Sequence, residues 1–190
     1  MKLALFDLDG TLLPTDSDHA FGEFMVQIGW VDATVWRARN DRFFAQYQAG
    51  TLDLAEYLDF ATSAWRGRSP DEAEAARERF MREVIGPQLH ASARSLVDGH
   101  RQAGDLVAVV TATNEFVTHP IAAAFGVEHL LAVELERDDN GRVTGRSHGV
   151  PTFREGKVTR VGAWLAEQGR AWTDFDDVLF YSRSEERRVG

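Results

Sequence analysis

Short, continuous apolar runs, each followed by polar residues, constrain the fold of this chain more than any other feature. They are Leu3-Ala4-Leu5-Phe6, Leu106-Val107-Ala108-Val109-Val110 and Val178-Leu179-Phe180-Tyr181. Unbroken apolar runs of this length are typical of strands that are buried on both faces of a parallel sheet. Ligands of open α/β sheets bind beyond the carboxyl ends of the strands. We therefore expect the polar residues that follow these runs, Asp7 first among them, to share one crevice.

The segment between the first two runs changes to helical spacing. Apolar residues fall at i, i+3, i+4 and i+7 in two series, which are Phe21, Phe24, Met25, Ile28 and Leu54, Tyr57, Leu58, Ala61, Trp65. Thr51 is an expected cap of the second series, and Ser69-Pro70-Asp71-Glu72 has the pattern of a capping box with proline at the first helical position. We predict a helical cap over residues 16–90, inserted into an α/β core of residues 1–15 and 91–190.

The remainder of the core follows from the same criteria. A helix over about residues 92–103 is expected to lead into the second strand. After a further apolar helix we predict a hairpin in which residues 131–135 pair with residues 142–148. An amphipathic helix then precedes the third strand. The predicted fold class is α/β, with a doubly wound, Rossmann-like parallel sheet.

Composition narrows the class of protein. Thirty acidic residues against 21 lysines and arginines give a net charge of −9, which disfavours a surface that coats nucleic acid or anionic lipid. The chain has no cysteine, so it has no disulfide, thiolate metal site or cysteine nucleophile. No stretch approaches the roughly 18 apolar residues of a transmembrane helix, and the first apolar run is too short for a signal peptide. We expect a soluble, cytoplasmic protein with no nucleic-acid or membrane partner.

Asp7-Leu8-Asp9-Gly10-Thr11 carries the sharpest chemical signal in the chain. Residues two apart in an extended backbone point the same way, so both carboxylates can lie on one face of the strand exit. One can bind Mg²⁺ and attack phosphorus, while the other donates and then removes a proton. The alternatives are an Asp-rich turn and an EF-hand-type calcium loop. The calcium loop requires glycine where this chain has Leu12, and it follows a helix instead of an apolar strand.

These residues resemble the haloacid dehalogenase superfamily. Phe6-Asp7-Leu8-Asp9-Gly10-Thr11-Leu12 is similar to its first motif, and Val109-Val110-Thr111-Ala112-Thr113-Asn114 to its second. Glu155-Gly156-Lys157-Val158 resembles the third motif in the phosphoserine-phosphatase-like branch, which also carries a helical cap between the first two motifs. The motifs occur in the order that the family requires, and the resemblance covers about residues 3–182.

The resemblance implies a role for each matching residue. Asp7 would be the nucleophile that becomes aspartyl-phosphate, and Asp9 the acid that protonates the leaving oxygen and later activates water. Thr111 would hydrogen-bond a phosphoryl oxygen, and Lys157 would neutralise charge on the phosphoryl group and on Asp7. The implied cofactor is Mg²⁺, held by Asp7 and Asp9.

Further residues are candidates for substrate binding. Asp16 lies where this branch carries an acid that faces the substrate's amino group, but an aspartate before a first helical turn is also a favourable cap. Both interpretations of Asp16 stay open. Asp18 and His19 complete a polar cluster at the entrance of the predicted cap, and Thr113 and Asn114 of the second motif are additional candidates.

Three polar residues of the predicted cap, Arg37, Arg39 and Asn40, also have two interpretations. They would contact substrate if they faced the core, or they would form a solvated helix face. A solvated face is usual for the polar side of a helix, so we expect these three residues to be exposed.

The sequence departs from the family pattern after the third strand. The family's fourth motif supplies an acidic Mg²⁺ ligand there, whereas this chain has Arg183, a cation that would repel the metal. Replacement by Glu185 or Glu186 is not expected, because both belong to a charged tail with little apolar anchorage. The pattern indicates a truncated C-terminus that would weaken Mg²⁺ binding.

The sequence therefore favours a Mg²⁺-dependent phosphatase. Its partner would be a small phosphorylated metabolite that bears an amine, such as a phosphoserine-like or histidinol-phosphate-like compound. Two alternatives stay open. One is a phosphate-binding protein with little catalysis because the fourth motif is missing, and the other is a phosphotransferase or phosphomutase of the same superfamily.

Overall fold

A central sheet of mostly parallel strands organises the computed structural model, which describes residues 1–182 and 187–188. The strand order is β3-β2-β1-β6-β7, in which β7 alone runs antiparallel to its neighbour. The strands of this sheet are β1 (Leu3–Phe6), β2 (Leu106–Asn114), β3 (His129–Val133), β6 (Val178–Tyr181) and β7 (Arg187–Arg188). The predicted α/β fold with a parallel sheet is confirmed, and the three apolar runs form adjacent strands at its centre.

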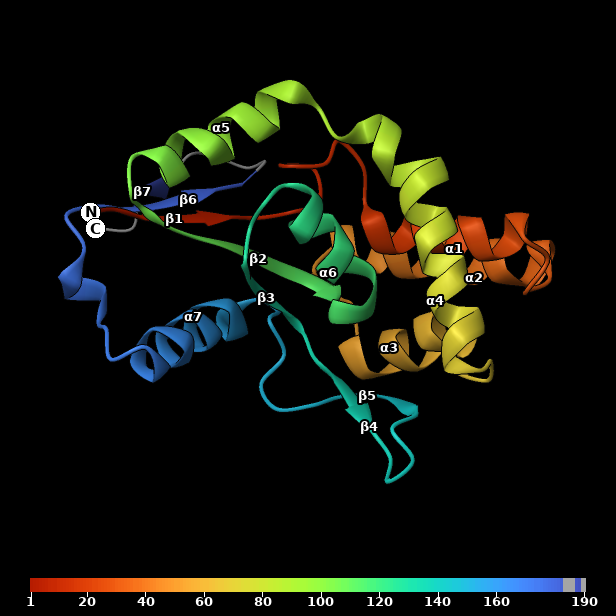
Figure 1. Cartoon of the computed structure of the whole chain (residues 1–190). Helices are drawn as coiled ribbons and strands as arrows, with labels where there is room; N and C mark the ends of the chain where they lie inside the picture. The colour runs from red at the N-terminus through yellow and green to blue at the C-terminus, as the bar shows by residue number, and fades with distance from the viewer. Residues whose placement is uncertain (183–186, 189–190) are drawn as a thin grey trace.

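Helices cover both faces of the sheet. Alternate side chains of β1 point to opposite faces of the sheet. Ala4 and Phe6 pack with α5 and α6, whereas Leu3 and Leu5 pack with α7. Figure 1 shows α5 and α7 on opposite sides of the strands. The bounds of these elements are α5 (Ala91–Gln102), α6 (Glu115–Ala124), α7 (Glu155–Glu167) and the short 3-10 helix η3 (Trp172–Asp174). Burial on both faces explains why β1 and residues 106–110 of β2 are continuously apolar.

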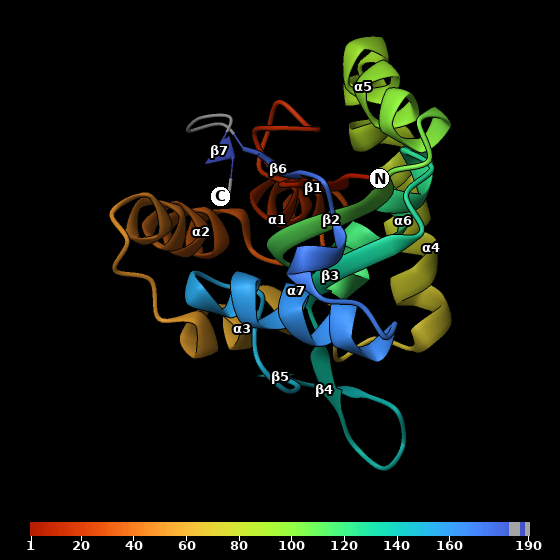
Figure 2. The same cartoon turned by 90° about the vertical axis from the view of Figure 1, so that its left-hand side faces the viewer.

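The segment between β1 and α5 is helical. It contains α1 (Ser17–Gln27), α2 (Ala33–Gln48), α3 (Leu54–Ser63), α4 (Pro70–Phe80), the π-helix η1 (Met81–Ile85) and the 3-10 helix η2 (Gly86–Gln88). The first four gather beyond the carboxyl end of β2, and Figure 2 gives the same arrangement from the side. The division into a core and a cap at residues 16 and 90 stays a prediction.

Helix caps in this segment follow local chemistry. The capping box predicted at Ser69 and Glu72 is present, with Pro70 at the start of α4. The expected cap at Thr51 is wrong, because the Asp53 side chain accepts the amides of Ala55 and Glu56 and begins α3 two residues later. A carboxylate at this position also interacts favourably with the helix dipole.

The predicted hairpin is correct only in its second half. Residues 131–133 belong to β3, which pairs in parallel with β2 in the main sheet. The hairpin consists of β4 (Leu135–Arg137) and β5 (Val143–Ser147). The prediction paired residues 131–133 with a neighbouring segment of the chain. In the structure they pair instead with β2, which is separated from them by α6. Among the described residues, no helix is both long and apolar enough to cross a membrane.

Candidate active site

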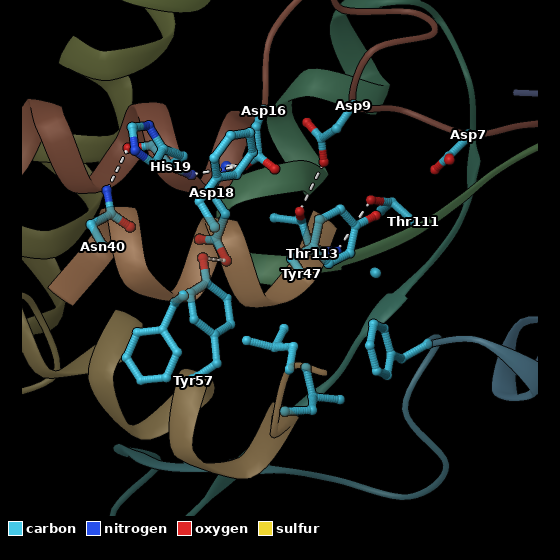
Figure 3. A pocket seen from close by; sticks show the side chains of 16 residues that line it. Asp7, Asp9, Asp16, Asp18, His19, Asn40, Tyr47, Tyr57, Thr111 and Thr113 are labelled. Atoms are coloured by element: carbon cyan, nitrogen blue, oxygen red, sulfur yellow. Dashed lines mark hydrogen bonds between the residues drawn. The ribbon is translucent and has the colours of Figure 1, made fainter. Parts of the chain in front are cut away.

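A pocket lies where the ends of β1 and β2 meet the first three helices. Figure 3 shows Asp7, Asp9, Asp16 and Asp18 around the pocket, with Tyr57 of α3 next to Asp18 and Tyr47 of α2 next to Thr113. The lining residues are Asp7, Asp9, Asp16, Asp18, His19, Asn40, Phe43, Phe44, Tyr47, Leu52, Leu54, Tyr57, Thr111, Ala112, Thr113 and Phe153. The pocket thus contains most of the residues that the sequence singles out, at the strand ends where a ligand site is expected.

Asp7 is positioned by the backbone of the sheet and by a lysine from the far end of the chain. Its amide donates to the Tyr181 carbonyl oxygen at 2.9 Å, which extends the pairing of β1 with β6. Asp7 Oδ1 accepts from Lys157 Nζ at 3.0 Å and from the Leu8 amide at 3.0 Å. Lys157 lies in the first turn of α7. The two residues that the first and third motifs singled out are therefore in direct contact.

Asp9 has a different environment. Its Oδ1 accepts from the Ser17 amide at 2.7 Å and its Oδ2 from Thr113 Oγ1 at 2.9 Å. Burial of the carboxylate, followed by the nearby charge of Asp16, raises its pKa to about 7. A carboxyl group with a pKa near neutrality can donate a proton and later accept one at physiological pH.

The second motif lies inside β2, which extends through Asn114. Thr111 and Thr113 are buried, and the Thr113 amide donates to Thr111 Oγ1 at 3.2 Å. Since the Thr111 oxygen accepts this bond, its own proton can be donated to a ligand in the pocket. Asn114 does not line the pocket wall. Its side chain caps α6 and donates from Nδ2 to Asp18 Oδ1 at 3.2 Å.

Asp16 and Asp18 lie at the start of α1, as its N-cap and in its first turn, but their side chains have different partners. Asp16 Oδ1 accepts from the amides of Asp18 at 3.1 Å and His19 at 2.8 Å, so the capping interpretation of Asp16 describes its contacts. Asp18 is only 7% exposed. Its Oδ2 accepts from the Tyr57 hydroxyl at 2.8 Å. Burial, followed by the charge of Asp16, raises the pKa of Asp18 to about 7.

The expectation of a solvated face at residues 37–40 is wrong for one residue. Asn40 is 3% exposed, lines the pocket and donates from Nδ2 to the His19 carbonyl oxygen at 3.2 Å. Arg37 and Arg39 are exposed as expected. Arg37 pairs with Glu23 across α1 and α2. Asn40 is buried because α2 packs closely on α1 at Gly22, where an added Cβ would lie 2.8 Å from Asn40 Nδ2.

Aromatic pocket residues were not singled out by sequence reasoning. The pocket is also lined by Phe43, Phe44, Tyr47 and Phe153, and the Tyr57 hydroxyl donates to Asp18. Tyr57 belongs to the apolar series of α3, which predicted a core position for it. Its hydroxyl distinguishes it from the other members of that series, because a buried Tyr hydroxyl usually has a partner.

The predicted fourth-motif positions Arg183, Glu185 and Glu186 lie outside the described residues. Within residues 1–182 and 187–188, no group of three or more His, Asp or Glu side chains is spaced as a metal site. Magnesium does not require such a group, since it is usually bound by one or two carboxylates together with waters and substrate phosphate. Asp7 and Asp9 supply donors of this kind. Both carboxylates line one pocket together with Asp16 and Asp18, so the residues present fit Mg²⁺.

Comparison with known proteins agrees with this arrangement. The family of haloacid dehalogenase-like hydrolases matches residues 4–184. The chain belongs to this family. The match includes Asp7, Asp9, Thr111 and Lys157, which carry the resemblance of the sequence motifs.

Individual relatives of this haloacid dehalogenase-like hydrolase include curated and structurally solved proteins. A histidinol-phosphatase of Neisseria meningitidis serogroup C (strain 8013) is 39% identical over 184 residues, which are 97% of this chain and 83% of that protein. A protein of unknown function from Bordetella pertussis Tohama I has 49% identity and a TM-score of 0.88, over 94% of this chain and 80% of its own. A substrate-bound phosphoserine phosphatase has 19% identity and a TM-score of 0.63, over 94% of this chain and 76% of its own, and supports the fold alone.

These findings confirm two predictions from the sequence. The first is membership of the haloacid dehalogenase superfamily, with phosphoserine- and histidinol-phosphatase-like relatives. The second is that the protein is an enzyme, a phosphoric monoester hydrolase. The roles of the individual site residues remain predictions.

Proposed function

We propose that this haloacid dehalogenase-like hydrolase is a Mg²⁺-dependent phosphatase that works through an aspartyl-phosphate on Asp7. The observation that carries the proposal is the 3.0 Å contact of Lys157 Nζ with Asp7 Oδ1, because Asp7 lines the same pocket as Thr111. A carboxylate and a phosphomonoester repel one another, and an adjacent ammonium offsets that repulsion. Phosphoryl transfer depends mostly on such positioning and charge stabilisation.

In the first half-reaction the phosphoryl group moves from the substrate to Asp7. An Asp7 carboxylate oxygen attacks phosphorus while the bond from phosphorus to the ester oxygen breaks. Asp9, whose pKa is raised to about 7 by burial and by the charge of Asp16, gives its proton to the departing oxygen. The Thr111 hydroxyl donates to a phosphoryl oxygen, and Lys157 stabilises the charge that develops there.

The second half-reaction regenerates the enzyme. Asp9, now a carboxylate, removes a proton from water as that water attacks the phosphorus of the aspartyl-phosphate. The bond from phosphorus to Asp7 breaks, and inorganic phosphate leaves. The hydrogen bond from Thr113 Oγ1 to Asp9 Oδ2, 2.9 Å long, orients the carboxyl group for these proton transfers. Asp7 and Asp9 are the residues that would hold Mg²⁺, which would supply positive charge to the phosphoryl oxygens.

The proposed substrate is a small phosphomonoester that carries a basic group. The histidinol-phosphatase relative at 39% identity supports an imidazole- and amine-bearing substrate, and the additional aspartates of the pocket support a cation. A phosphoserine-like substrate is the second candidate of the same class. A cytoplasmic location stays a prediction from the sequence.

Turnover of purified protein tests this function. Histidinol phosphate, phosphoserine and p-nitrophenyl phosphate should each be assayed with Mg²⁺ and after chelation by EDTA. We expect Mg²⁺-dependent release of phosphate, fastest with histidinol phosphate. Binding of phosphate without turnover would favour the non-catalytic alternative. Transfer of the phosphoryl group to an added alcohol, in preference to water, would favour a phosphotransferase.

A further inference from the structure

Asp18 is a pocket carboxylate whose hydrogen-bond partners are neutral side chains from two other elements, α3 and the end of β2. Both of its hydrogen-bond partners are neutral, the Tyr57 hydroxyl at 2.8 Å and the Asn114 amide at 3.2 Å. Across residues 1–182 and 187–188, no lysine or arginine forms an ion pair with it. Its neighbour His19 pairs instead with Asp41 at 3.1 Å. Asp18 thus differs from Asp7, which contacts Lys157 directly.

The two neutral partners fix the orientation of Asp18. Asn114 approaches Oδ1 from the end of β2, and Tyr57 approaches Oδ2 from α3. Asn114 is itself held, since its Oδ1 caps α6 through the Val117 amide at 3.2 Å. Each carboxylate oxygen can accept more than one hydrogen bond, so the pocket side of Asp18 can still receive donors from a ligand.

Aromatic rings surround the space that Asp18 lines. The Tyr57 ring packs against Phe43 with centroids 5.4 Å apart. Tyr47 and Phe153 form a second pair, with centroids 6.4 Å apart, on the same pocket. Figure 3 shows the Asp18 carboxylate pointing toward the Tyr57 hydroxyl. A carboxylate beside aromatic faces suits a cation with a flat or apolar body, because the rings attract both features.

Burying a carboxylate without a cation is costly, and an apolar or amide side chain would fill this position more cheaply. The cost is visible in the raised pKa of Asp18. Asp16, by comparison, lies at the helix start and is engaged by two backbone amides. A structural role as a cap therefore explains the contacts of Asp16. Asp18 lies in the first turn of α1, where the helix dipole favours an acid, but its side chain is bound by Tyr57 and Asn114 and not by the amides of that turn.

We propose that Asp18, oriented by Tyr57 and Asn114, binds the cationic group of the substrate's alcohol portion and makes the enzyme selective for basic phosphomonoesters. The inference rests on the proposed phosphatase function and assigns the selectivity of that same pocket. Asp18 is a specificity-determining residue, and Tyr57 and Asn114 are positioning residues.

Substrate selectivity of single variants tests the proposal. The kcat/KM of Asp18→Asn should be measured with histidinol phosphate, which carries basic groups, and with p-nitrophenyl phosphate, which carries none. We expect a loss of about 10- to 100-fold for histidinol phosphate, the range for a hydrogen bond to a charged group, and a change of less than about threefold for p-nitrophenyl phosphate. Tyr57→Phe keeps the ring and should give a smaller selective loss.

Two further variants identify the residue responsible. Asp53→Asn alters an exposed cap of α3 that does not line the pocket, and it should leave both substrates unchanged. Asp16→Asn retains a good cap and should change selectivity less than Asp18→Asn does. Equal losses for both substrates in Asp18→Asn would show that Asp18 only shapes the pocket, and would overturn the proposal. A selective loss confined to Asp16→Asn would also overturn it, in favour of Asp16.

Calorimetric binding of histidinol, the dephosphorylated alcohol, separates the inference from the proposed function. We expect wild-type protein to bind histidinol at least about tenfold more tightly than Asp18→Asn does. If wild-type protein hydrolyses neither ester but binds histidinol through Asp18, the phosphatase proposal fails and the assignment of Asp18 stands. If wild-type protein hydrolyses the esters but Asp18→Asn binds histidinol equally well, only the assignment of Asp18 fails.

Discussion

The strand side and the helix side of the site treat the charges of Asp7 and Asp18 differently. Asp7 and Thr111 line the pocket on the strand side, where Lys157 contacts Asp7, and Asp16, Asp18 and Tyr57 line it on the helix side. On the strand side, Lys157 contacts Asp7 at 3.0 Å. On the helix side, Asp18 is buried against a hydroxyl and an amide. Its pKa rises to about 7 as a result of burial and the Asp16 charge.

This difference in charge compensation indicates which part of a ligand each side can bind. A carboxylate paired with an ammonium can accept a further anion, because the pair carries no net charge. A buried carboxylate with neutral partners is stabilised only when a cation or a proton arrives. The strand side is thus suited to a phosphate and the helix side to a base. The following predictions test this division, beginning with the largest expected effect.

Loss of the Asp7 carboxylate should have the largest effect. We expect Asp7→Asn to lower kcat by at least about 10⁴-fold, as removal of a covalent nucleophile commonly does. The matched control is Asp98→Asn, on the exposed side of α5, which should retain full activity. Steady-state turnover measures both. Retention of wild-type turnover by Asp7→Asn would remove Asp7 from the chemistry and the strand side from the proposal.

Loss of the cation on the strand side should be less severe. Lys157→Met keeps the length of the side chain but removes the charge next to Asp7, and we expect kcat to fall by about 10²- to 10³-fold. Lys2 is the chain's other lysine and pairs at the surface with Asp177, so Lys2→Met is the matched control. If the two variants lose activity equally, the contact of Lys157 with Asp7 has no special role.

Removal of the Asp18 charge on the helix side should raise the free energy of unfolding, and the increase should depend on pH. The folded-state pKa of Asp18 is about 7, raised from 3.8, so folding opposes its ionisation. This penalty is absent below about pH 4, grows between pH 4 and pH 7, and is complete above pH 7. We expect Asp18→Asn to raise the free energy of unfolding by up to about 4 kcal/mol at pH 8 and by less than about 1 kcal/mol at pH 4.

Urea denaturation of metal-free protein at the two pH values measures this change. Asp53→Asn, at an exposed cap, should show no such pH dependence. An Asp18→Asn variant that is less stable than wild type at pH 8 would indicate that Asp18 supports the fold, and the comparison between the two sides would then fail.

The smallest predicted effect concerns Arg154, which joins the third-motif loop to the helices. Among the described residues it is the one non-glycine residue with positive φ, at φ 52° and ψ −124°. Its side chain donates to the Gly50 carbonyl oxygen between α2 and α3. Both Arg154→Gly and Arg154→Ala lose this bond, but only glycine relieves the backbone strain. We expect the glycine variant to be more stable than the alanine variant by about 1 kcal/mol.

The matched control for Arg154 is an exposed position inside α7. Ala163→Gly should destabilise the protein by about 1 kcal/mol, because glycine costs that much in a helix interior. The two positions should therefore rank glycine and alanine in opposite order in thermal or urea denaturation. The same order at both positions would mean that Arg154 bears no backbone strain.

The strand side was predictable from sequence because its residues follow buried strands. Two apolar runs without a polar residue identify β1 and the first part of β2. The parallel register then places Asp7 and Thr111 at the same edge of the sheet. The order of the motifs then adds Lys157, which the structure places 3.0 Å from Asp7. Each step depends on short segments whose pattern is local.

The helix side was less predictable because it depends on how helices pack. Tyr57 has the spacing of a core residue, and its contact with Asp18 joins positions on α3 and α1. Asn40 has the pattern of a solvated residue, yet the close approach of α2 to Gly22 buries it. The hairpin prediction failed for the same reason, since β3 pairs with β2 through a contact that its own segment does not reveal.

Direct detection of the covalent intermediate tests the central claim of the account, that Asp7 receives the phosphoryl group. Wild-type protein should be mixed with histidinol phosphate and Mg²⁺, quenched in acid during turnover, and reduced with borohydride, which converts an aspartyl-phosphate to homoserine. We expect peptide mass spectrometry to find homoserine at position 7, and to find none without substrate. Release of phosphate with unmodified Asp7, or with homoserine at another aspartate, would contradict the account.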